Sequence, residues 1–169
     1  KRFLGVEMNE DAIAAMPPGL EGNLHKGDIW DYLEGAASSE PFDRVVILDV
    51  LEHFSAADGV RLLEKIKTVL APGGLVVARL PNMGSPWGGM HQFADLTHKC
   101  AYTPQSLEQL GQAAGYKTLA FLPQRRGSPF RRLTEDCLHG FLSRVLTVTP
   151  VVWTPNMIAV LEPETGGGG

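Results

Sequence analysis

One segment of the sequence decides the fold class, Phe42-Asp43-Arg44-Val45-Val46-Ile47-Leu48-Asp49-Val50-Leu51-Glu52-His53. Its apolar run at 45–48 is continuous rather than alternating, which is typical of a parallel strand buried on both faces. Three ionisable side chains, Asp49, Glu52 and His53, follow the end of that strand. Because ligands of open α/β sheets bind beyond the carboxyl ends of strands, the segment predicts both a buried strand and the edge of a binding site.

Strands and helices alternate on either side of this segment. Ser55 begins a helix with apolar side chains at helical spacing, Gly73-Gly74 ends it, and residues 75–80 are expected to form the next buried strand. Upstream, residues 3–7 are a short apolar strand that ends in a carboxylate. The pattern predicts an α/β fold with a doubly wound, mostly parallel sheet.

The last third of the chain predicts an antiparallel hairpin that contains a helical insert. Residues 117–122 and 157–161 have the composition of strands, and a helix is expected between them within residues 128–147. The Gly-rich end, residues 164–169, is expected to be a flexible tail. Residues 1–163 are therefore expected to form a single domain.

The composition excludes several classes of protein. Apolar residues make up 44% of the 169, enough for one sizeable core. The net charge of −4 argues against a nucleic-acid partner, because phosphate binding usually needs a basic excess. No apolar run is long enough to span a bilayer, and the first residues do not resemble a signal peptide, so a cytoplasmic location is expected. Nucleophile motifs of hydrolases and the phosphate-binding loop of kinases are also missing.

The stretch at 81–103 has no structural period and is long for a structureless loop, which favours a functional role. Within it, Asp95 and His98 lie three residues apart. A histidine beside a carboxylate can act as a general base, so His98 with Asp95 is the first candidate and His53 the second. The alternative is that these side chains only hydrogen-bond the loop.

A small basic cluster precedes and enters the expected helical insert. It either holds an anionic group of a substrate or forms a solvated face. Its members are Arg125, Arg126, Arg131 and Arg132.

Taken in order, the motifs resemble those of class I S-adenosylmethionine-dependent methyltransferases. They are Leu4-Gly5-Val6-Glu7-Met8-Asn9, Gly27-Asp28-Ile29, the segment at 42–53 and Leu70-Ala71-Pro72-Gly73-Gly74-Leu75. Further motifs at 93–98, 102–107 and 114–116 resemble methyltransferases of bacterial surface-polysaccharide and secondary-metabolite pathways. The resemblance implies S-adenosyl-L-methionine as cofactor and O-methylation of a sugar, glycan or small-molecule hydroxyl.

The resemblance also implies which residues hold the cofactor. Glu7 would bind the ribose, and Met8 would flank the adenine. Asp28 would meet the adenine amine, and Ile29 would stack on the ring. The stretch Asp49-Val50-Leu51 would lie beside the methionine part.

The family opens with a strand and a Gly-rich loop, whereas the first strand of this sequence matches the family's second. The first β–α unit is therefore expected to be missing, which would leave its two neighbouring strands each with an unpaired edge. This motivates a first alternative, a non-catalytic methyltransferase-like interaction module. Exposed sheet edges would also favour a homodimer.

A second alternative is metal-assisted ribose 2′-O-methylation of RNA. Small-RNA methyltransferases of this superfamily bind a divalent metal through a Glu-x-x-Glu-His run and a later histidine, and this sequence has the same spacing. The corresponding residues are Asp49, Glu52, His53 and His98. The same Glu-His pair occurs in family members without metal, and the acidic net charge argues against RNA, so the main interpretation includes no metal.

Overall fold

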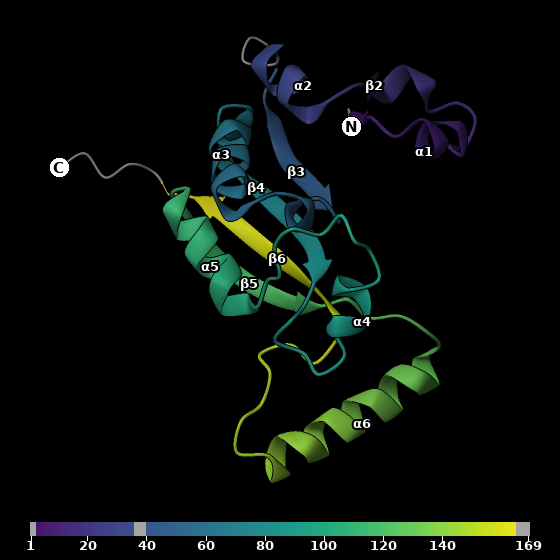
Figure 1. Cartoon of the computed structure of the whole chain (residues 1–169), viewed down its shortest axis with the longest axis vertical. Coiled ribbons are helices and arrows are strands. Elements are labelled where there is room, and N and C mark those ends of the chain that lie inside the picture. Colours follow the sequence, from purple (N-terminus) through teal and green to yellow (C-terminus); the bar gives the residue numbers. More distant parts are fainter. Residues whose placement is uncertain (1–2, 36–39, 165–169) are drawn as a thin grey trace, which may run out of the picture.

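The structure is a computed structural model that describes residues 3–35 and 40–164 (Figure 1). Of the expected Gly-rich tail, all but Glu164 lies outside the described residues. The elements in chain order are β1 (Gly5–Glu7), α1 (Glu10–Ala14), η1 (Glu21–Asn23), β2 (Leu24–Lys26), α2 (Ile29–Gly35), β3 (Phe42–Leu48), η3 (Leu51–His53), α3 (Ala56–Lys67), β4 (Leu70–Pro81), α4 (Gly89–Gln92), α5 (Pro104–Ala113), β5 (Tyr116–Pro123), α6 (Pro129–Val145) and β6 (Asn156–Pro163).

The main sheet has the strand order β3-β4-β6-β5. β3 and β4 are parallel, whereas β6 runs antiparallel to both of its neighbours, β4 and β5. The central strand β4 alternates buried and half-buried side chains, with Val76, Ala78 and Leu80 fully buried. The predicted α/β fold and the predicted antiparallel hairpin of β5 and β6 are confirmed.

The strands β1 and β2 form a separate parallel pair, in which Gly5 lies opposite Leu24 and Glu7 opposite Lys26. Among the described residues no strand lies between β1 and β3, so each has one unpaired edge. A cavity of ≈ 360 Å³ separates β1 and α2 from β3. Val46 and Val50 line one side of it.

The helices α3 and α5 pack on each other and cover the main sheet (Figure 1). The Ser55 hydroxyl accepts a hydrogen bond from the Asp58 backbone and begins α3, as the sequence predicts. Thr103 and Ser106 form a reciprocal capping box at the start of α5. The buried Tyr116 hydroxyl donates to the Leu63 carbonyl at 2.8 Å and joins β5 to α3.

The segment after β4 is folded tightly against the sheet rather than structureless. The buried Asn82 side-chain amide donates to the carbonyls of Val152 and Thr154 at 2.8 and 3.1 Å. A Cβ at Gly88 would lie 1.8 Å from the Asn82 carbonyl oxygen, so only glycine fits there. This packing fixes the start of the segment that carries Asp95 and His98.

Helix α6 projects from one end of the molecule, away from α3 and α5 (Figure 1). Its bounds, Pro129–Val145, agree with the helix predicted within residues 128–147. No helix in the described part of the chain combines the length and the apolar character needed to cross a membrane.

Candidate active site

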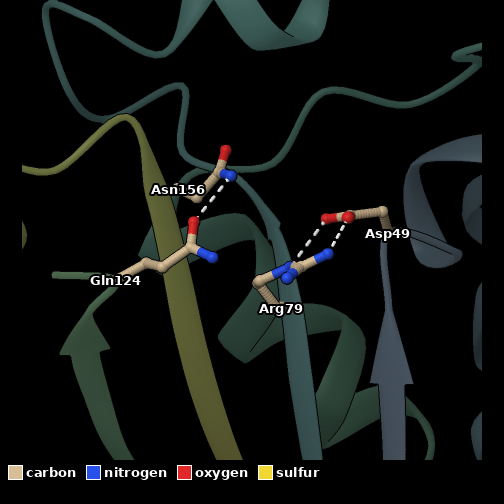
Figure 2. Close-up of polar contacts among 4 residues, drawn as sticks. All are labelled: Asp49, Arg79, Gln124 and Asn156. Carbon is tan, nitrogen blue, oxygen red and sulfur yellow. Dashed lines mark hydrogen bonds and ion pairs between the residues drawn. The ribbon is translucent and has the colours of Figure 1, made fainter. Parts of the chain in front are cut away.

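An ion pair lies where β3 and β4 end. Asp49 has a backbone φ of 53°, in the left-handed region, and its N–H donates to the Arg79 carbonyl at 2.9 Å. The Arg79 guanidinium pairs with both carboxylate oxygens of Asp49, as the dashed lines in Figure 2 show. Hydrogen bonding to Asp49 raises the pKa of Arg79. Sequence reasoning missed Arg79, for which the signal is a lone cation in an otherwise apolar strand.

Near this pair, Glu52 in η3 is 1% exposed. Neither of its carboxylate oxygens has a hydrogen-bond partner among the described residues. Burial is the main reason that the pKa of Glu52 is raised to about 7. The proximity of its own backbone N–H lowers the pKa, the nearby Asp49 raises it, and His98 lowers it. A carboxyl group with this pKa can exchange a proton at neutral pH.

A chain of hydrogen bonds connects Asp95 to His53 through Thr97. The Thr97 hydroxyl lies 2.7 Å from a carboxylate oxygen of Asp95 and 2.9 Å from Nδ1 of His53. Since a carboxylate only accepts, the hydroxyl donates to Asp95 and accepts the Nδ1–H of His53, which leaves Nε2 with its lone pair. Hydrogen bonds from Thr97 lower the pKa of Asp95.

His98 is oriented by a different group from the one expected. Its Nδ1 lies 2.8 Å from the Gln92 carbonyl oxygen, which only accepts, so the proton sits on Nδ1 and the Nε2 lone pair is free. The expected pairing of His98 with Asp95 is absent from the side-chain hydrogen bonds of the described residues, because Asp95 turns to Thr97. The structure instead places His98 against His53, with ring centres 4.6 Å apart.

Three groups of this site have the arrangement of a metal centre. Ligand atoms of Glu52, His53 and His98 all lie within 4.8 Å of one another. Neutral imidazole nitrogens and a carboxylate oxygen suit several divalent cations, and the unpartnered Glu52 oxygens fit that role. Asp49, the fourth residue of the sequence-based metal alternative, is not in the group because it pairs with Arg79.

The expected cofactor residues of β1 lie at the end of that strand. Glu7 accepts hydrogen bonds through Oε1 from the backbone N–H groups of Met8 and Asn9 at 2.9 and 2.8 Å. The side chain of Met8 is 68% exposed. The Gly27 N–H donates to the Glu7 carbonyl at 3.0 Å and so ties this strand end to the turn that carries Asp28.

The other expected cofactor residues are divided between the cavity and its surroundings. Asp28 accepts a hydrogen bond from the Trp30 N–H at 2.7 Å and caps α2. Ile29 and Val50 line the same cavity as Glu7. Leu51 is 1% exposed and belongs to the hydrophobic core. The structure therefore gathers Glu7, Ile29 and Val50 around one cavity.

Sequence comparison identifies a family for most of the chain. A family profile described as "Methyltransferase domain" matches residues 4–120. No curated protein matches the sequence.

Solved structures share the fold at low sequence identity. A SAM-dependent methyltransferase from Archaeoglobus fulgidus has a TM-score of 0.67 and 19% identity, over 94% of this chain and 74% of that one. The small RNA methyltransferase HEN1 has a TM-score of 0.62 and 19% identity, over 95% of this chain and 20% of that one. The mitomycin 7-O-methyltransferase MmcR has a TM-score of 0.56 and 16% identity, over 86% of this chain and 35% of that one.

Proposed function

Because the chain belongs to the methyltransferase-domain family, we propose that it methylates a hydroxyl group of a sugar, glycan or small molecule. It is a methyltransferase rather than a non-catalytic module, and its methyl donor is S-adenosyl-L-methionine. The observation that supports a hydroxyl acceptor is the pair of imidazoles, His53 and His98, each with a free Nε2. An alcohol needs a base before it attacks a methyl group, and these groups supply one.

The proposed reaction is an in-line displacement. The acceptor oxygen forms a bond to the methyl carbon as the carbon–sulfur bond breaks, and S-adenosylhomocysteine leaves with the bonding electrons. The hydroxyl proton passes to Nε2 of His53 or His98. Asp95, acting through the Thr97 hydroxyl, stabilises the imidazolium that forms on His53.

In the proposed cofactor site, the Glu7 carboxylate accepts hydrogen bonds from the ribose hydroxyls. Its carboxylate is held in place by two backbone N–H groups, so it is already oriented before the cofactor binds. Ile29 packs on the adenine ring from the end of the neighbouring strand β2, and Asp28 accepts from the adenine amine. Holding both reactants in this way is the main contribution an enzyme makes to methyl transfer.

A divalent cation is a second candidate for activating the acceptor. Glu52, His53 and His98 would hold it, and when bound it would polarise the acceptor oxygen as a Lewis acid. The unpartnered buried oxygens of Glu52 favour this candidate. The net charge of −4 argues against RNA as the acceptor.

Calorimetric titration with S-adenosylhomocysteine tests the cofactor site. We expect binding by the unmodified chain and a loss of at least about tenfold in Glu7→Ala, since Glu7 would make two charge-assisted hydrogen bonds. Glu21→Ala is the matched control, because Glu21 is an exposed acid outside the cavity. Absence of binding, or equal binding by Glu7→Ala, would contradict the proposed site.

Transfer of tritium from labelled S-adenosyl-L-methionine tests the acceptor side, with a phenol and a nucleotide sugar as probes. We expect His53→Ala or His98→Ala to lose about a hundredfold in rate while binding S-adenosylhomocysteine normally.

Titration of chelator-treated protein with Mn²⁺ tests the second candidate, activation of the acceptor by a divalent cation. Binding that disappears in Glu52→Gln but persists in the exposed control Glu64→Gln would support it.

A further inference from the structure

Helix α6 is amphipathic, and its polar face is turned toward the rest of the molecule. The His139 ring stacks on Trp153 at 5.1 Å between ring centres, and the Trp153 indole N–H donates to the Ser143 hydroxyl at 3.0 Å. Arg125, just before the helix, pairs with Asp136 at 2.8 Å. These contacts hold α6 in place through polar groups.

The opposite face of α6 is apolar and exposed. No residue of the helix is buried. Five large side chains on it are between 50% and 74% exposed and recur at spacings of three to five residues, which places them on one side of a helix. They are Phe130, Leu133, Leu138, Phe141 and Val145. We call this set the α6 stripe.

The charges beside the α6 stripe are positive. At 3.6 residues per turn, Arg144 falls within the stripe and Arg131 at its edge. Neither has an ion-pair partner within the described part of the chain. The two acids of the helix, Glu135 and Asp136, instead line a second cavity, which lies between the inner side of α6 and residues 151–154. Residues 125–145 hold five arginines and two acids, although the whole chain has a net charge of −4.

We propose that the α6 stripe docks the protein on the surface of an anionic lipid bilayer. Phenylalanine, leucine and valine side chains insert at the boundary between headgroups and acyl chains, and arginines at their flank reach the lipid phosphates. The unpaired charges of Arg131 and Arg144 complement such a surface. No residue of the candidate active site belongs to the α6 stripe, so docking on a bilayer is independent of the proposed function.

A second copy of this chain fits the same face less well. Pairing two stripes would bring unpaired arginines of both copies together without an acid between them. The apolar side chains of the stripe would fit either a bilayer surface or a second copy of the chain. The unpaired charges of Arg131 and Arg144 favour the anionic bilayer.

Flotation with lipid vesicles tests the proposal. We expect the chain to float with vesicles of equal parts phosphatidylglycerol and phosphatidylcholine, and to float less with phosphatidylcholine alone or in high salt. Leu133→Asp and Phe141→Asp should each reduce the bound fraction severalfold. The double variant Arg131→Gln with Arg144→Gln should remove the preference for anionic vesicles. Leu119→Asp is the control, since Leu119 is an exposed leucine on β5.

Three results would overturn the proposal. The first is no flotation of the unmodified chain, and the second is the same loss in Leu119→Asp as in Leu133→Asp. The third is a dimer in sedimentation equilibrium that Leu133→Asp dissociates while vesicle binding is absent, which would assign the stripe to a second copy. Circular dichroism checks that each variant keeps its helix content.

Discussion

The imidazole rings of His53 and His98 lie 4.6 Å apart at an interplanar angle of 73°, although they come from separate segments. Each ring is oriented by its own anchor, the Thr97 hydroxyl for His53 and the Gln92 carbonyl for His98. Because both anchors hold Nδ1–H, both rings have Nε2 free to accept a proton or bind a cation. This shared tautomer is the basis of the proposed chemistry.

Thr97→Val removes the link between Asp95 and His53. We expect a fall in kcat of about tenfold, in the range typical of losing a group that orients a catalytic side chain, with unchanged affinity for S-adenosylhomocysteine. Thr97→Ser keeps the hydroxyl and should retain most of the activity. Nitrogen NMR of the histidines gives a second measurement, since the His53 ring should become a mixture of tautomers in Thr97→Val only.

Glu52→Gln should change the pH dependence of stability. The folded-state pKa of about 7 lies above the usual 4.5, so the folded protein binds more protons than the unfolded chain between these values. Stability of the metal-free protein is therefore lost as pH rises from 4.5 to 7. Glu52→Gln should remove about 2 to 3 kcal/mol of this loss between pH 5 and pH 8. Urea unfolding at pH 5 and pH 8 measures it, and a parallel shift at both values would contradict it.

Gly88→Ala should destabilise the fold by ~3 kcal/mol, because its Cβ would lie 1.8 Å from the Asn82 carbonyl oxygen and backbone must move. Gly140→Ala is the matched control, since nothing lies within 4 Å of a Cβ there. On the exposed helix α6 that change should stabilise by up to about 1 kcal/mol. Denaturant midpoints of the two variants should therefore move in opposite directions.

Two substitutions at Asp49 separate its charge from its backbone. Asp49→Asn removes the ion pair with Arg79 and should cost under about 1 kcal/mol, because both side chains are partly exposed. Asp49→Ala also places a less suitable residue at φ 53° and should cost ~1 kcal/mol more. Equal thermal shifts of the two variants would mean that the left-handed conformation adds no strain.

The elements that carry a local signal were predictable from the sequence. The apolar run after Phe42 predicts β3, and Thr103 followed by Pro104 predicts the start of α5, because capping and periodicity depend on neighbours in the chain. The flexible tail expected at residues 164–169 and the homodimer expected from exposed sheet edges remain predictions.

The residues of the candidate site could be predicted from the sequence, whereas the hydrogen bonds between them could not. His53, Asp95 and His98 were singled out, but their connections through Thr97 and Gln92 were not. Such contacts depend on how a loop without period folds back on η3, where the Lys99 N–H donates to the Glu52 carbonyl at 2.7 Å. The partner of Asp49 was missed for the same reason, since Arg79 lies on another strand.

The position of β6 determines when this protein can fold during synthesis. The strand order β3-β4-β6-β5 places β6 between β4 and β5, two strands that are both made before it. Until residues 156–163 emerge from the ribosome, β4 and β5 have no common partner and their facing edges stay open. The nascent chain therefore passes through a stage in which chaperones or strands of other chains can bind the open edges of β4 and β5.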